Sequence, residues 1–450
     1  MQAITHLYLK LIPYFQFDLW DTKRYTSKSI SSIYDVVYLG NCIKEENKKY
    51  KLFEEENKEF GILGVNNKTG IFDAYLQKGK DINQAYKKME IGWLAYNPYR
   101  INVGSIGVRL TEHKNEYISP AYVVFSCKSN IMPEYLFLLF KTDIFNKVIN
   151  ESTTGSVRQN LTIDILKKLK VPLPSIKEQK ILIDNYYKEI QKADYLAVKE
   201  NNLERDIEKY FFSILGIDER KDYTLKKGLN FIENTNLAKW SLNHINKEIY
   251  DFESAKFKTE RLKNLLTFFA GGKTPSKSRN DFWDGNIYWT SPKDFNGRIA
   301  IEKAEDKITQ LAVKEAGMKV YPKGIILSVF RSGILQHSFP TAITQIETAI
   351  NQDLKAYSLK EDLIDKKYYL YFVHTFKKYI LSLASKKSVT VESINTEDFF
   401  EIPIPLPPID IQREISNKIT RLRSEIDDLK SEKIKLEHTA GQQFEKAIFN

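Results

Sequence analysis

Three stretches rich in glycine, serine and threonine carry the residues of this 450-residue sequence that are best suited to chemistry: "AGGKTPSKSRNDFWDGN", "TTGSVRQN" and "SKKSVT". Cations, hydroxyls and exposed amides on such loops can all contact phosphate groups. Arginine, glutamine and asparagine side chains can also form paired hydrogen bonds with guanine or adenine edges. These stretches therefore predict a surface that binds nucleic acid, although each residue could instead belong to a solvated turn.

The residues expected to contact DNA share a position in or beside such polar turns. They are Asn66, Lys68, Tyr99, Arg100, Ser156, Arg158, Gln159, Asn160, Lys273, Thr274, Ser276, Lys277, Arg279, Arg331, Lys386, Lys387, Ser388 and Thr390.

Catalytic motifs are incomplete wherever the sequence approaches one. "GGKT" resembles the end of a phosphate loop, but the position of its first glycine holds Thr267. "NPY" at residues 97–99 lacks the second proline of an amino-methyltransferase motif, and no F-x-G-x-G loop exists to seat a methyl donor. Asp164, Glu178 and Lys180 resemble a nuclease set, but the last two lie in an expected helix cap. We therefore predict no catalytic residue and no metal site.

Composition narrows the class further. A chain of 450 residues is longer than one that usually folds around a single hydrophobic core, so we expect two or more domains. A formal charge of +10 favours a polyanionic partner. Cys42 and Cys127 are the only cysteines, and with six histidines they offer no convincing zinc or disulfide framework. The sequence shows no signal peptide and no membrane-spanning run, so we expect a cytoplasmic protein without membrane contact.

One phrase occurs twice: "VPLPSIKEQ" at residues 171–179 and "IPLPPIDIQ" at residues 404–412. Pro172 pairs with Pro405 and Gln179 with Gln412, each 233 positions apart, and Gly92 lies 232 positions before Gly324. Each half therefore follows one order: a globular segment, a proline-rich hinge and a long helix. The expected boundaries are 1–174 and 221–407 for the globular domains, and 175–220 and 408–450 for the helices.

The hinge and the helix start have a local physical basis. Proline fixes its own φ and disfavours helical backbone at the preceding residue, so P-x-P ends a strand in an extended connector. Ser175 and Glu178 have the spacing of a capping box. The second copy has Pro408 in place of Ser175, but Asp410 still puts negative charge in the first turn.

Apolar residues recur every three or four positions after each hinge, which predicts a heptad seam and a helix of roughly 35 to 40 residues. The globular segments alternate strand-like stretches such as "IGWLAYNPYRINVGSIGVRL" with helix-like ones such as "PEYLFLLFKTDIFNKVIN". The seam residues are Ile183, Tyr186, Ile190, Ala193, Ala197, Leu203, Ile207 and Tyr210 in the first helix, and Ile415, Ile419, Leu422, Ile426, Leu429, Leu436 and Ala440 in the second.

This arrangement, with "GGKTPSK" and "FWDGNIYWTSPKDF" opening the second half, resembles the specificity subunit of type I restriction and modification systems. The resemblance covers essentially the whole chain and rests on "PLPSIKEQ", "PLPPIDIQRE" and "GGKTPS"; Trp20 and Trp240 look like parts of the lead-in to each domain. It implies an α/β (α+β) fold with two target recognition domains in pseudo-twofold repeat, joined by a long antiparallel two-helix coiled coil. The wording "FGILGVNNKTGIF" in the first domain departs from "NIYWTSPKDFNGRI" in the second, as expected for readers of different bases.

The resemblance also implies a non-catalytic reader of a bipartite double-stranded DNA target. Its partners would be two modification (methyltransferase) subunits and the restriction (translocase and endonuclease) subunits. S-adenosylmethionine, ATP and magnesium would belong to those partners, with no cofactor on this chain. Two alternatives stay open: a self-contained DNA methyltransferase or nuclease, and a coiled-coil scaffold that binds DNA without sequence preference.

Overall fold

A computed structural model describes residues 30–152, 160–217, 252, 255–386 and 391–449. The chain divides into two compact units: unit 1 comprises Met1–Ala197 and Lys430–Asn450, and unit 2 comprises Val198–Leu429. Both long helices are therefore divided between the units, whereas the sequence assigned one whole helix to each half.

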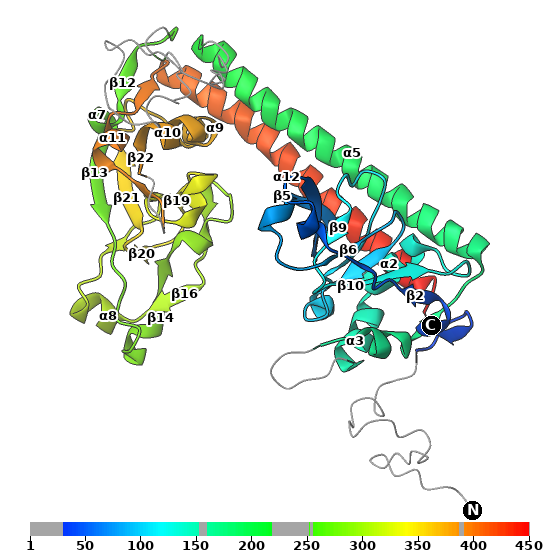
Figure 1. The fold of residues 1–450 in the computed structure, drawn as a ribbon. Coiled ribbons are helices and arrows are strands. Elements are labelled where there is room, and N and C mark those ends of the chain that lie inside the picture. Colours follow the sequence, from blue (N-terminus) through cyan, green and yellow to red (C-terminus); the bar gives the residue numbers. More distant parts are fainter. Residues whose placement is uncertain (1–29, 153–159, 218–251, 253–254, 387–390, 450) are drawn as a thin grey trace, which may run out of the picture. The chain divides into compact units, whose positions relative to one another are not determined.

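Unit 1 contains two main sheets with helices beside them (Figure 1). One sheet has the antiparallel order β2-β10-β7-β8, and the other has the order β3-β6-β9-β4-β5, in which β4 and β9 are parallel. Aliphatic and aromatic residues of the first sheet and of helices α2 and α3 form the main core. The bounds are Ile43–Glu45 (β2), Lys49–Tyr50 (β3), Glu59–Asn66 (β4), Gly70–Lys78 (β5), Tyr86–Lys88 (β6), Leu94–Tyr96 (β7), Ile106–Val108 (β8), Tyr117–Ile118 (β9), Val123–Cys127 (β10), Pro133–Lys141 (α2), Asp143–Ser152 (α3) and Ile163–Lys167 (α4).

Unit 2 repeats this topology. Its sheets have the orders β13-β21-β18-β19-β15 and β16-β14-β20-β17, and the parallel pair of the second sheet is β14 and β20. The bounds are Leu262–Leu265 (α7), Leu266–Gly271 (β13), Trp283–Thr290 (β14), Ala300–Ile301 (β15), Asp306–Ile308 (β16), Gln310–Glu315 (α8), Val320–Tyr321 (β17), Ile326–Val329 (β18), Thr341–Thr344 (β19), Thr348–Ile350 (β20), Leu354–Leu359 (β21), Lys366–Thr375 (α9), Lys377–Ala384 (α10), Ser385–Lys386 (β22), Ser393–Ile394 (β23) and Thr396–Phe400 (α11).

The corresponding strands explain the sequence repeat. β2, β10, β7 and β8 take the same order as β13, β21, β18 and β19, and β6, β9, β4 and β5 take the same order as β17, β20, β14 and β16. The differing stretches "FGILGVNNKTGIF" and "NIYWTSPKDFNGRI" therefore begin within β4 and β14, the same strand in the two units. Gly92 and Gly324 both have positive φ, of 82° and 84°, where a side chain would strain the backbone.

Each proline-rich hinge is the second strand of a small antiparallel pair. β11 (Lys170–Pro172) pairs with β1 (Val36–Tyr38), and β24 (Pro403–Pro405) pairs with β12 (Thr259–Arg261). The hydroxyl of Tyr135 donates to the carbonyl of Pro172 over 3.0 Å, and that of Tyr368 donates to Pro405 over 2.7 Å. The hinges are thus held by equivalent contacts 233 positions apart.

The glutamine after each hinge is fully buried and makes the same three hydrogen bonds in each unit. Gln179 accepts from the Met132 amide over 2.7 Å and donates to the carbonyls of Asn130 and Pro174 over 3.0 and 2.8 Å. All of these residues have a counterpart 233 positions later, where Gln412 bonds Asp365, Leu363 and Pro407 over 2.8, 3.0 and 2.7 Å. The glutamine joins the helix to the loop before α2 or α9.

The two long helices are α5 (Ile176–Leu215) and α12 (Ile409–Lys446). The predicted capping box of α5 is present: the Ser175 hydroxyl accepts from the Glu178 N–H over 3.4 Å. The backbone N–H and the hydroxyl of Ser175 in turn donate to the Glu178 carboxylate, over 2.8 and 2.7 Å. These bonds hold the pKa of Glu178 below its usual value.

The helices run antiparallel within each unit (Figure 1). In unit 1 the start of α5 meets the end of α12, where the rings of Tyr186 and Phe444 lie 6.1 Å apart. In unit 2 the end of α5 meets the start of α12: the Lys418 ammonium lies 3.9 Å from the Tyr210 ring, and Arg423 bonds Glu204 over 3.3 Å. Seam residues such as Ala193, Ile207, Ile415, Ile419 and Ile426 are buried, as the heptad pattern predicts.

Candidate nucleic-acid interface

In unit 1, the described candidates lie on three neighbouring loops. Asn66 ends β4 and Lys68 lies in the turn to β5, Tyr99 and Arg100 lie between β7 and β8, and Asn160 follows α3. A backbone hydrogen bond of 3.0 Å from Leu161 to Pro98 joins the third loop to the second. The structure therefore brings together residues from distant parts of the sequence.

The turn between β4 and β5 is fixed by its own side chain. The Asn66 side-chain oxygen accepts from the backbone N–H groups of Lys68 and Thr69, each over 2.8 Å, and from the Thr69 hydroxyl. Gly70 completes the turn with a φ of 75°. Asn66 is thus occupied in shaping the turn, while the Lys68 side chain is exposed.

In unit 2, two indoles hold the loop between β13 and β14. Trp289 donates to the carbonyl of Lys273 and Trp283 to that of Ser276, each over 3.1 Å, and the two ring centroids lie 5.2 Å apart in an edge-on arrangement. The backbone of the loop is thereby fixed, while the side chains of Lys273 and Lys277 remain exposed. A rigid loop that projects cations loses little entropy when it binds a phosphate.

Arg279 differs from the lysines of the same loop. Its guanidinium pairs with Asp281 over 2.6 Å and with Glu315 over 3.1 Å, and it lies 4.2 Å from the centre of the Phe282 ring. Hydrogen bonds to the two carboxylates raise the pKa of Arg279. Its charge is already compensated within unit 2, so we expect it to contribute less to DNA binding than Lys273 or Lys277.

Short contacts link this loop to the other candidates of unit 2. The Thr274 hydroxyl donates to Gln352, and the carbonyl of the next residue, Asp353, accepts from the backbone N–H of Arg331 over 3.2 Å. Arg331 also forms a β-bridge with the first residue of β23, and β23 pairs with β22, which ends at Lys386. Thr274, Arg331 and Lys386 therefore lie on one connected surface.

The exposed cations of these loops have no acidic partner in the part of the chain that the structure describes. This holds for Lys68, Arg100, Lys273, Lys277, Arg331 and Lys386. An uncompensated cation is what a phosphate contact needs. Six further candidates lie outside the described residues: Ser156, Arg158, Gln159, Lys387, Ser388 and Thr390.

Some residues of the interface escaped sequence reasoning. Lys141, at the end of α2, donates to the carbonyls of Asn67 and Gly104, and Trp283 and Trp289 hold the loop of unit 2. Lys141 gives little sequence signal because its acceptors are backbone carbonyls, which every residue supplies. The tryptophans stand in the stretch "FWDGNIYW", but the sequence does not show which backbone carbonyls accept their hydrogen bonds.

The nuclease-like set does not form a site. Glu178 caps α5 through Ser175, Lys180 pairs with Asp184 over 2.6 Å, and Asp164 lies in the first turn of α4. Among the described residues, no group of three or more histidine, cysteine or acidic side chains could hold a metal ion. Within the same residues, no helix is both long and apolar enough to cross a membrane.

Comparison with known proteins agrees with this architecture. The family described as "Type I restriction modification DNA specificity domain" matches residues 30–205 and 254–438, which correspond to the two repeats. The chain is 31% identical over 219 residues to the EcoR124I/EcoR124II specificity subunit of Escherichia coli, covering 48% of this chain and 54% of that protein. It is 32% identical over 163 residues to the MjaIX specificity subunit of Methanocaldococcus jannaschii, covering 36% of this chain and 35% of that protein. These matches span about half or less of the relatives' length.

The fold also has a solved counterpart. A structure titled as the basis of complex assembly and conformational transition of the type I R-M system aligns with 94% of this chain and 99% of its own, at 15% identity and a TM-score of 0.54. The two matches to this family, one in each repeat, define a protein with two DNA specificity domains. The chain belongs to the type I restriction modification DNA specificity family.

Proposed function

We propose that this chain is the sequence reader of a type I restriction and modification complex. Each unit would bind one half of a bipartite double-stranded DNA target. The observation that carries the proposal is that both units present exposed cations, without an acidic partner among the described residues, on loops of one repeated topology whose sequences differ. A shared scaffold with different loops suits two readers of different half-sequences.

The proposal assigns catalysis to partners. Two modification subunits would supply methyl transfer with S-adenosylmethionine, and restriction subunits would supply ATP- and magnesium-dependent translocation and cleavage. The chain itself would hold no cofactor and would act in the cytoplasm. Family membership and the similarity to specificity subunits support this assignment.

Selection from a library of randomised duplexes tests the reader function. The purified full-length chain, alone and with its modification subunits, should enrich two short conserved blocks separated by a spacer of fixed length and free sequence. Enrichment of one contiguous block would contradict two readers. Binding without any preference would instead favour the scaffold alternative.

A second assay tests the enzymatic alternative. The chain alone is incubated with cognate DNA and a labelled methyl donor, and in parallel with magnesium and supercoiled DNA. We expect neither label transfer nor cleavage until the partner subunits are added. Turnover by the purified chain would identify a self-contained methyltransferase or nuclease.

A further inference from the structure

The ammonium of Lys141 joins two loops of unit 1 that carry candidate DNA contacts. It donates to the carbonyl of Asn67 over 3.2 Å, in the turn between β4 and β5, and to the carbonyl of Gly104 over 3.0 Å, at the end of the loop that follows Arg100. The Phe137 ring lies 5.3 Å from the same nitrogen. One side chain therefore links the two loops.

The backbone of Lys141 is held by the core and by α12. It ends α2, whose Leu139 and Phe140 are buried in the core. The next helix, α3, begins at Asp143, whose backbone N–H donates to the Glu445 carboxylate of α12 over 2.7 Å. Because α2 and α3 are fixed at this point, the backbone of Lys141 is held in place and its side chain reaches the two loops from a fixed base.

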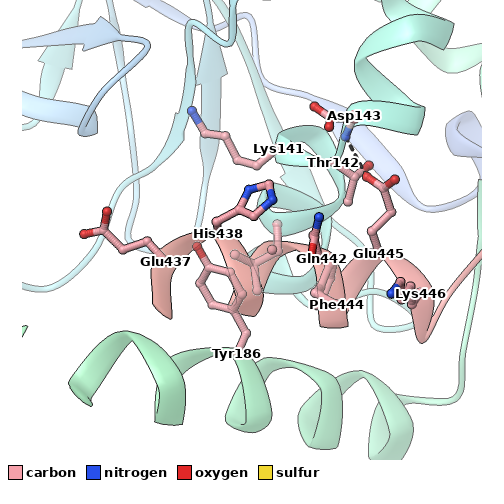
Figure 2. A pocket seen from close by; sticks show the side chains of 12 residues that line it. Lys141, Thr142, Asp143, Tyr186, Glu437, His438, Gln442, Phe444, Glu445 and Lys446 are labelled. Carbon is pink, nitrogen blue, oxygen red and sulfur yellow. Dashed lines mark hydrogen bonds between the residues drawn. The ribbon is translucent and has the colours of Figure 1, made fainter. Parts of the chain in front are cut away.

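Figure 2 shows Lys141 on the wall of a cavity of about 380 Å³ between α2, α3 and the end of α12. The side chain extends away from Asp143 and Glu445, and in the described part of unit 1 it pairs with no carboxylate. Burial lowers the pKa of Lys141. A half-buried ammonium without a counter-ion is stabilised when it is hydrogen-bonded, and its bonds to the two carbonyls account for its position.

Among the described residues, one other side-chain hydrogen bond links these loops, from the Ser105 hydroxyl to the Val65 carbonyl over 3.3 Å. That bond is longer and joins neutral groups, so it is expected to be weaker than a charge-assisted one. The turn of Asn66 is rigid within itself. The bases of the two loops also pack closely, backbone on backbone, at Gly70 and Gly107. Lys141 adds to this packing its charge-assisted bonds to Asn67 and Gly104.

Unit 2 uses a different residue at the equivalent position. His374 lies 233 positions after Lys141, near the end of α9, and its Nε2 donates to the Thr341 carbonyl over 2.8 Å. This single bond reaches the first residue of β19, whereas Lys141 connects two loops. The connection made by Lys141 is therefore specific to unit 1.

We propose that Lys141 is a positioning residue for sequence reading by unit 1. It holds the loop of Lys68 and the loop of Tyr99 and Arg100 at the separation needed to read one half-site, without itself contacting DNA. The inference rests on the proposed function and deepens it. Loss of Lys141 should therefore relax base preference at one half-site only.

The test compares four full-length proteins: the natural chain, Lys141→Met, Lys141→Arg and the control Lys147→Met. Methionine keeps much of the volume of lysine but removes the donors, whereas arginine keeps donors and charge. Lys147 is exposed on α3, so its replacement controls for the loss of one positive charge. Each protein is tested against cognate DNA and single-base variants of both half-sites, at several salt concentrations.

Lys141→Met should reduce discrimination about tenfold at one half-site, a loss typical of one misplaced paired contact. Discrimination at the other half-site should stay unchanged, as should the dependence of log affinity on log salt concentration. Lys141→Arg should restore most of the preference, and Lys147→Met should keep all of it. If Lys141→Met unfolds unit 1, Lys141→Gln, with one remaining donor group, should give a partial loss.

Three results would overturn the inference. First, the preference of Lys141→Met for cognate over variant DNA could stay within about twofold of that of the natural chain, although a displaced base contact should reduce it more. The same criterion applies to Lys141→Gln where that variant is used. Second, the preference could fall equally at both half-sites. Third, the salt slope could decrease by about one unit with preference intact, which would reveal a direct phosphate contact. A natural chain that lacks two preferred half-sites would contradict the proposed function itself, before any variant is compared.

Discussion

Replacing Gln412 by methionine should destabilise unit 2 because it removes the three hydrogen bonds of a fully buried side-chain amide. The amide bonds the Asp365 N–H and the carbonyls of Leu363 and Pro407 over 2.7 to 3.0 Å. Methionine fills a similar volume but leaves these three backbone groups without their partner. A lost hydrogen bond to a buried or part-buried group costs about 1 kcal/mol, so the free energy of unfolding should fall by about 3 kcal/mol.

The change is best measured by urea unfolding combined with hydrogen exchange and mass spectrometry. Exchange resolves peptides of unit 2 from those of unit 1, and the loss of protection should concentrate around α9 and the start of α12. Gln179→Met is the matched variant in unit 1, where the same three bonds are broken around α2. Gln442→Met, at an exposed position of α12, is the control.

The reasoning is refuted if Gln412→Met unfolds within about 0.5 kcal/mol of the natural chain, since even one orphaned buried group should exceed that. It also fails if the exposed control Gln442→Met causes an equal loss. A third contradictory result would be Gln179→Met lowering protection only in unit 2. Each outcome separates the specific bonds of the buried amide from a general effect of methionine in a helix.

Three other changes give distinct signatures. Burial lowers the pKa of His374 to about 4, so the unfolded chain takes up a proton at a higher pH than the folded chain does. The free energy of unfolding should therefore decrease by up to about 3 kcal/mol as the pH falls from 6.5 to 4. In acid unfolding curves, His374→Gln should remove this dependence. Replacing both Lys273 and Lys277 by glutamine should lower the salt slope of DNA binding by about two units, whereas Arg279→Gln should lower it by much less; equal slopes for Lys273→Gln and Arg279→Gln would contradict the role of the ion pairs. Glu445→Ala should cost about 1 kcal/mol by uncapping α3, seen as faster exchange of its first amides, with no change in α10.

The repeat and its helices could be predicted because their determinants are local or periodic. Gln179 and Gln412 stand in one phrase with prolines at fixed spacing, Ser175 and Glu178 form a cap within a single turn, and the apolar seam follows the helical period. Gly92 and Gly324 were found as a repeated pair, and both have the left-handed backbone that glycine permits. Such features need no knowledge of what lies across the fold.

The chemistry of the candidate site was only partly predictable because it depends on distant partners. Arg279 looked equivalent to Lys277 until Glu315, 36 positions away, was found beside it. Lys141 looked like the polar end of an apolar helix until two backbone carbonyls were found to accept from it. Charge in a sequence shows which residues could meet a phosphate, but only the fold shows which charges are already compensated.

The reciprocal use of the two helices explains why the phrase after the hinge recurs so closely. In unit 1 the Tyr135 ring lies 5.9 Å from Phe444 of α12, and in unit 2 the Tyr368 ring lies 6.1 Å from Phe211 of α5. Both residues of the second contact are displaced by 233 positions from those of the first, in opposite directions along the chain. Each unit therefore packs on the start of the helix that follows it and on the end of the other helix. A change in one copy of the phrase therefore alters the support of one unit only, and each unit needs its own copy.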